Sequence, residues 1–126
     1  MPISYDIDRE KNLTVFTLSG ELNFHDFKST LDHYRKIGPT SLELYNTSSL
    51  SGKRLSSDEL NMLTNYLSQY TNVRPPGSKT AIVASDDLDY GLSRMISTLT
   101  EGRTVYNIQA FRSMDEANEW LLIADE

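Results

Sequence analysis

The stretch TAIVASDDLDYGLSRMISTLTEGRTVYNIQAF, residues 80–111, holds the pattern that decides the fold. Residues 80–84 (TAIVA) are small and apolar in succession, which is typical of a short strand covered on both faces. Residues 86–100 repeat apolar side chains at helical spacing. The side chains predicted to face inward are Leu88, Leu92, Met95, Ile96 and Leu99. Residues 105–111 predict another strand, so this stretch indicates a parallel β-α-β unit with a right-handed crossover.

The same alternation extends toward the N-terminus. Residues 3–8 alternate apolar and polar side chains, which predicts an edge strand with one face in water. Residues 13–18 are apolar on both sides and predict an internal strand, and the short charged turn before them indicates an antiparallel hairpin. Asn23 is the expected N-cap of a helix that ends at Gly38.

The middle of the chain completes the pattern. We expect a strand over residues 41–45, a polar loop over 46–55 and a helix over 56–70. The inward stripe of this helix consists of Leu60, Leu63, Leu67 and Tyr70, widened by Met62 and Tyr66. Ser113 caps the last helix. The predicted order is β-β-α-β-α-β-α-β-α, which describes a single α/β domain over residues 1–126 with a five-stranded, mixed but mainly parallel sheet and four helices.

Composition excludes several classes of partner. The 126 residues carry 12 basic and 18 acidic side chains, and the resulting charge of −6 repels phosphate backbones, so we expect no nucleic-acid partner. The chain has no cysteine and therefore no disulfide or thiolate site. No apolar run reaches the length of a transmembrane segment, and the first residues lack a secretory signal, so a cytoplasmic location is expected.

Four stretches resemble the SpoIIAA-like (STAS-type) domain family. They are MPISY at 1–5, AIVA at 81–84, LDYGLSRM at 88–95 and FRSMDEANEWL at 111–121. The resemblance runs almost end to end and is strongest to a branch of small, uncharacterised stand-alone bacterial proteins. It implies a small α/β fold, and it implies the roles known for such domains, as anti-sigma-factor antagonists or as cytoplasmic tails of anion transporters.

Antagonists of this type carry an Asp-Ser-Ser-Gly motif in which a kinase phosphorylates one serine. The corresponding stretch here is Leu55-Ser56-Ser57-Asp58, without the preceding Asp or the following Gly. The resemblance therefore makes Ser56 and Ser57 candidate phosphorylation sites. The alternative is structural, because Ser56 followed three residues later by Glu59 has the pattern of a helix capping box.

No group of residues has the pattern of a catalytic centre. His25 and His33 are the only histidines, and their spacing on one helix points them about 80° apart, so they could not share a metal ion without ligands from elsewhere. Asp86, Asp87 and Asp89 lie where acidic side chains complement a helix dipole. We therefore expect a protein that is not an enzyme and that needs no metal or cofactor.

Three functions stay open. The first is a non-catalytic binding domain, with or without a regulatory role, which uses Met62, Tyr66, Tyr90 and Arg94 as a surface for a protein partner or for self-association. The second is a carrier of a small apolar ligand or lipid, with Phe27, Met62, Tyr66 and Met95 as candidate lining residues. The third is a phosphorylation-controlled anti-sigma-factor antagonist, which rests on the resemblance.

Overall fold

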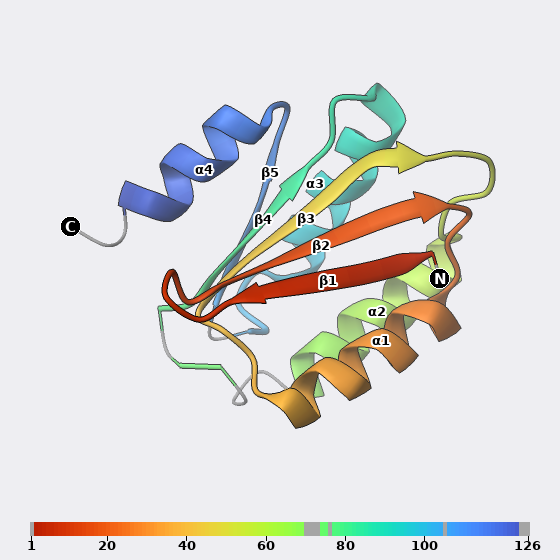
Figure 1. Cartoon of the computed structure of the whole chain (residues 1–126). Helices are drawn as coiled ribbons and strands as arrows, with labels where there is room; N and C mark the ends of the chain where they lie inside the picture. The colour runs from red at the N-terminus through yellow and green to blue at the C-terminus, as the bar shows by residue number, and fades with distance from the viewer. Residues whose placement is uncertain (1, 70–73, 76, 105, 124–126) are drawn as a thin grey trace.

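The computed structural model describes residues 2–69, 74–75, 77–104 and 106–123 (Figure 1). Its elements follow the predicted order. They are β1 (Ile3–Asp8), β2 (Leu13–Gly20), α1 (Phe24–Ile37), β3 (Leu42–Leu50), α2 (Ser57–Gln69), β4 (Lys79–Val83), α3 (Asp87–Thr100), β5 (Asn107–Phe111) and α4 (Met114–Ile123). The expected ends at Tyr70 and Val105 lie outside the described residues.

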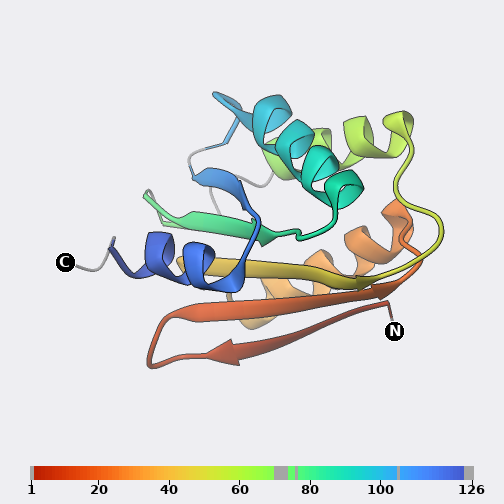
Figure 2. The same cartoon turned by 90° about the horizontal axis from the view of Figure 1, so that it is seen from above.

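The five strands lie side by side in the order of the sequence, β1-β2-β3-β4-β5. β1 pairs with β2 antiparallel, and the other neighbours pair in parallel, which confirms the predicted hairpin and mixed sheet. Each parallel strand is added on the same side of the previous one. Right-handed crossovers then put α1, α2 and α3 on one face of the sheet, while α4 covers the other (Figure 2).

The sheet carries a core on each face. Phe16 and Leu18 of β2 pack with α1 and α2, whereas Leu44 of β3 packs with Ala117 and Leu121 of α4. The alternation predicted for β2 is confirmed, because its Leu13 and Val15 contact the α4 side. The longest helices, α1 and α3, have 14 residues each. Within the described ranges, no helix is long and apolar enough to cross a membrane.

The polar loop predicted over residues 46–55 is wrong in its first half, because β3 continues to Leu50. Residues 46–50 pair with the second half of β2, including Ser19 with Ser49 and Gly20 with Leu50. This segment extends past the end of β4, and Thr47 Oγ1 donates to the carbonyl of Val83 at 2.8 Å. Because β4 does not continue beside residues 47–50, their side chains can be polar. The sequence there lacks the alternation of apolar and polar residues that predicts a strand.

The inward face predicted for α3 is also partly wrong. Leu88 and Met95 are 56% and 45% exposed, whereas Asp89 and Ser93 are buried. Leu92 and Ile96 do pack against the core below α1 and α2. The helix is rotated because Asp89 points inward to pair with Arg54, and a buried ion pair is not visible in a hydrophobic pattern.

Candidate functional site

A cavity lies below α2 in the described structure. α2 packs on α1 and α3, and its Leu60, Leu63 and Tyr66 share a core with Phe16 and Leu18 of the sheet. A cavity of about 80 Å³ lies between these helices and strands β2 to β5, and we call it the central cavity. Most of its lining is apolar, including Phe27, Leu31, Leu63, Ile82, Leu92 and Ile96. An engineered apolar cavity of about 150 Å³ binds benzene, so the central cavity has about half that volume and has to widen to hold a molecule of that size.

Arg54 and Asp89 form the first polar cluster in the lining. Arg54 lies between β3 and α2, and its Nε and Nη2 atoms donate to the two carboxylate oxygens of Asp89 at 2.6 and 3.1 Å. The side chains are only 13% and 5% exposed. Hydrogen bonding to Asp89 raises the pKa of Arg54, so the guanidinium stays charged, and the pair ties the β3–α2 loop to α3.

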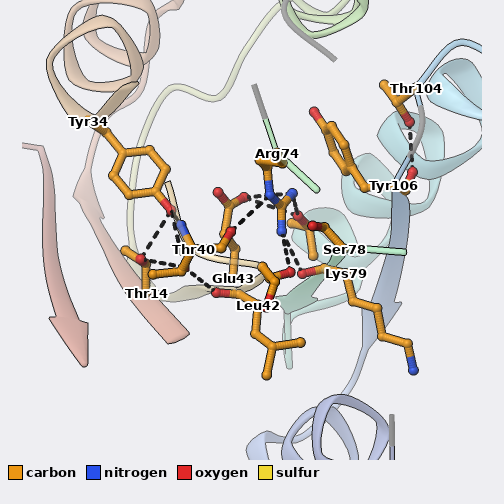
Figure 3. A network of polar contacts seen from close by, with 12 residues as sticks. Thr14, Tyr34, Thr40, Leu42, Glu43, Arg74, Ser78, Lys79, Thr104 and Tyr106 are labelled. Carbon is orange, nitrogen blue, oxygen red and sulfur yellow. Dashed lines mark hydrogen bonds and ion pairs between the residues drawn. The ribbon is translucent and has the colours of Figure 1, made fainter. Parts of the chain in front are cut away.

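Glu43 and Arg74 form the second polar cluster (Figure 3). Arg74 Nη1 lies 3.2 Å from Glu43 Oε1 and donates to Thr80 Oγ1 at 2.7 Å. The guanidinium lies 4.4 Å from the ring centroid of Tyr106, whose pKa burial raises to about 12. The remaining donors of Arg74 bond to the carbonyls of Thr40, Ser41 and Lys79. Since Arg74 is 5% exposed and fully bonded, its role is to hold the ends of β3 and β4 together.

A smaller cavity of about 40 Å³, the side cavity, shares Glu43, Tyr45 and Tyr106 with the central cavity. It also borders Tyr34, whose hydroxyl lies within hydrogen-bond distance of Thr14 and Thr40. Polar side chains therefore line the central cavity at two places, at the Arg54–Asp89 pair and where it shares Glu43, Tyr45 and Tyr106 with the side cavity.

Met62 and Tyr66 do not form one surface. Met62 is 48% exposed, whereas Tyr66 is buried against α1, where its hydroxyl bonds to Asp32 and Arg35. Burial raises the pKa of Tyr66, and hydrogen bonds from Lys28 and Tyr66 lower the pKa of Asp32 to about 2. The Met62 side chain alone faces outward here, and Tyr66 joins α2 to α1.

The residues expected to line a ligand site are divided in the same way. Phe27 lines the central cavity and Tyr66 the side cavity, but Met62 and Met95 face outward. The helical spacing of Met62 in α2 and of Met95 in α3 predicted a wider buried stripe on each helix than the structure has.

Tyr90 and Arg94 are not in contact as a stacked pair. Tyr90 is half-buried, and Arg112 covers its ring at 4.1 Å from the centroid. Arg112 also binds Asp87 at 2.6 Å, whereas Arg94 is exposed. Arg94 lies one helical turn from Tyr90, but the arginine on the Tyr90 ring is Arg112, which follows β5, the strand beside β4.

Ser56 and Ser57 begin α2 in the way a capping box predicts. Ser56 Oγ accepts from the Glu59 N–H at 3.2 Å, and Glu59 Oε1 accepts from the Ser56 N–H at 3.1 Å. Glu59 Oε2 also accepts from the Phe24 N–H at 2.8 Å, and these backbone donors lower the pKa of Glu59. The box is confirmed, and phosphorylation of either serine stays a prediction.

The histidines and the acidic cluster have structural contacts. His33 Nδ1 lies 2.8 Å from the Tyr5 hydroxyl, and His25 is exposed. Asp86 caps α3 by accepting from the N–H groups of Leu88 and Asp89. In the part of the chain that the structure describes, no three His, Cys, Asp or Glu side chains gather as a metal site.

Sequence reasoning missed the polar cavity residues Glu43, Arg54, Arg74 and Asp89. Glu43 carried a usable signal, because it lies between Leu42 and Leu44 in a strand of the predicted, mainly parallel sheet, and helices normally cover both faces of such a sheet. A carboxylate at such a position needs a buried partner. The partner itself, Arg74, lies in a turn next to Pro75 and had no pattern to identify it.

Comparison with known proteins supports the fold alone. No protein-family model matches the chain, and no curated protein matches it. A solved structure does match, that of an uncharacterized protein of the DUF3478 family with a SpoIIAA-like fold from Shewanella loihica PV-4. The TM-score is 0.64 and the identity 17%, over 94% of this chain and 93% of the other. The chain therefore has a SpoIIAA-like α/β fold, as the resemblance implied.

Proposed function

We propose that this SpoIIAA-like domain is a non-catalytic binding protein that holds a small, largely apolar molecule in the central cavity. The observation that carries the proposal is the cavity itself, where leucine, isoleucine and aromatic side chains from three helices and four strands surround unfilled space. Ligand sites are typically concave, mostly apolar and supplied with a few polar groups. On the sequence alone, we place the protein in the cytoplasm.

The arrangement of α2 supports entry of a ligand. α2 rests on α1 and α3, so a small outward movement opens the cavity without breaking sheet hydrogen bonds. The loop before α2 is held by the Arg54–Asp89 pair, which lines the same cavity. A ligand that fills the space gains contacts that the apolar lining lacks without it.

The test is a titration with toluene, followed by two-dimensional NMR of labelled protein. We expect the largest shifts at cavity residues such as Leu63 and Ile82. Leu63→Phe fills the cavity and should weaken binding about tenfold. Met62→Phe adds the same ring at an exposed neighbouring position and should leave binding unchanged.

Two further readouts make the test decisive. Native mass spectrometry of freshly purified protein should show an adduct that Leu63→Phe reduces. A clean mass together with no saturable shift at the cavity residues would reject the proposal. If Leu63→Phe lowers the melting temperature strongly, Ile82→Phe fills the same cavity from the sheet.

A second candidate is a protein-binding or self-association surface on the outer sides of α2 and α3. The specific observation is the exposure of Leu88, Met95 and Met62, at 56%, 45% and 48%. Exposed apolar side chains on neighbouring helices are typical of interaction surfaces. Sedimentation velocity should then show a dimer that Leu88→Ser with Met95→Ser dissociates. A monomer at all concentrations, together with a pull-down that recovers no partner, would exclude this candidate.

A further inference from the structure

Only one of the two carboxylate oxygens of Glu43 is bonded within the described residues. The residue is 5% exposed. Its Oε1 atom accepts from Thr80 Oγ1 at 3.0 Å and faces Arg74 Nη1 at 3.2 Å. Its Oε2 atom has no hydrogen-bond or ion-pair partner among the described residues, and Glu43 lines both cavities. Buried carboxylate oxygens are normally hydrogen-bonded, so Oε2 offers an acceptor to whatever fills the cavity.

Tyr45 lines the same two cavities as Glu43. It lies two residues after Glu43 in β3, on the same face of the sheet. Its ring is stacked on Phe16, with centroids 4.3 Å apart, which holds the ring in place. No described residue hydrogen-bonds to its hydroxyl. Burial raises the pKa of Tyr45 well above its usual value, so the hydroxyl keeps its proton.

These two groups select the chemistry of the ligand. Glu43 Oε2 accepts a hydrogen bond, and the Tyr45 hydroxyl can donate one. A neutral hydroxyl group has the matching donor and acceptor for both. A carboxylate ligand would be repelled by Glu43, and an ammonium group would approach the guanidinium of Arg74, which already neutralises that carboxylate.

We propose that the molecule bound in the central cavity is a small neutral alcohol or phenol, whose hydroxyl group donates to Glu43 Oε2 and accepts from the Tyr45 hydroxyl. The inference rests on the proposed function and adds the class of ligand. The apolar body of the molecule lies against Leu63, Ile82 and Leu92, and its hydroxyl lies at the lining that the two cavities share.

The experiment compares phenol with toluene, which have nearly the same shape but differ in the hydroxyl group. Dissociation constants are measured by NMR titration at pH 7 for the wild type and for Tyr45→Phe. The variant should bind phenol about tenfold more weakly and toluene within about twofold of the wild type. Tyr90→Phe removes a hydroxyl outside the cavity lining and should change neither constant. Benzoate and benzylamine should bind more weakly than phenol to the wild-type protein.

Glu43→Gln provides an independent test. Because Arg74 and Thr80 both need an acceptor, the amide oxygen should take the place of Oε1, and the amide nitrogen should face the cavity. The variant should therefore lose affinity for phenol and gain affinity for benzaldehyde, which only accepts hydrogen bonds. If Glu43→Gln does not fold, the comparison in Tyr45→Phe still decides the question.

The outcomes separate the two proposals. If toluene binds in the cavity but Tyr45→Phe weakens phenol and toluene equally, or neither, the ligand class is wrong and the cavity proposal stands. Ordered water bound to Glu43 and Tyr45 would give this result. If none of the probes binds at the cavity residues, the proposed function fails as well.

Discussion

At the scale of single residues, two ion pairs on α3 contrast sharply. Asp89 is buried and binds Arg54 through both oxygens, while Asp87 is 93% exposed and binds Arg112 through one. Breaking a buried pair leaves the other charge without compensation, whereas an exposed pair is screened by water. The two aspartates lie two positions apart on α3, so substituting each of them compares a buried with an exposed ion pair in the same helix.

Asp89→Asn should lower the free energy of unfolding by about 3 kcal/mol, because it leaves the Arg54 guanidinium largely buried without its carboxylate. Asp87→Asn should change it by less than about 1 kcal/mol. Urea unfolding followed by circular dichroism measures both. Equal effects of the two substitutions would show that the Arg54–Asp89 pair is solvated and does not tie the β3–α2 loop to α3.

The lowered pKa of Asp32 makes the free energy of unfolding depend on pH. Hydrogen bonds from Lys28 and Tyr66 lower its pKa from 3.8 to about 2 in the folded protein. A group with a lowered folded pKa stabilises the protein above its unfolded pKa and loses this contribution as the pH falls from about 4 to 2. Because the side chain is 33% exposed, we expect a contribution of about 1 kcal/mol.

Asp32→Asn should therefore flatten the stability curve between pH 5 and pH 2, as measured by urea unfolding at several pH values. Asp6→Asn, on the exposed side of β1, serves as the control and should keep the wild-type slope. A slope unchanged in Asp32→Asn would contradict the bonding described for Lys28, Asp32 and Tyr66.

At the scale of elements, the start of α2 decides between two interpretations of Ser56. Ser56→Ala removes the acceptor for the Glu59 N–H and should cost about 1 kcal/mol. Ser57→Ala, one position later and exposed, should cost less than about 0.5 kcal/mol. Thermal and urea unfolding of the two variants measure the difference. Equal stability would mean that the capping box contributes nothing, and phosphorylation would then be the better explanation for a serine here.

The sequence predicted the type and order of every element, because the apolar spacing and the caps are local. It failed where a long-range contact decides. Residues 46–50 join β3 through pairing with β2, although their side chains are polar. α3 turns Leu88 and Met95 outward because Asp89 binds Arg54, a residue of another loop. Neither contact changes the apolar periodicity of residues 46–50 or of α3, so the sequence pattern could not reveal it.

At the scale of the whole molecule, the strand order follows the chain, and three right-handed crossovers place three helices on one face. α1 contacts β1 and α3 contacts β5, so α2 spans the space between them over the middle of the sheet. The central cavity results from this arrangement. It could not be predicted from the sequence, since it depends on how far α2 lies from β3, which no local pattern encodes.

A crystal structure of the protein under xenon pressure tests the cavity most directly, because xenon enters apolar cavities and scatters strongly. The arrangement described here predicts a xenon peak below α2, in contact with Leu63, Ile82 and Leu92. A structure without that peak, in which α2 lies on the sheet and its side chains fill the space, would contradict the proposed binding function.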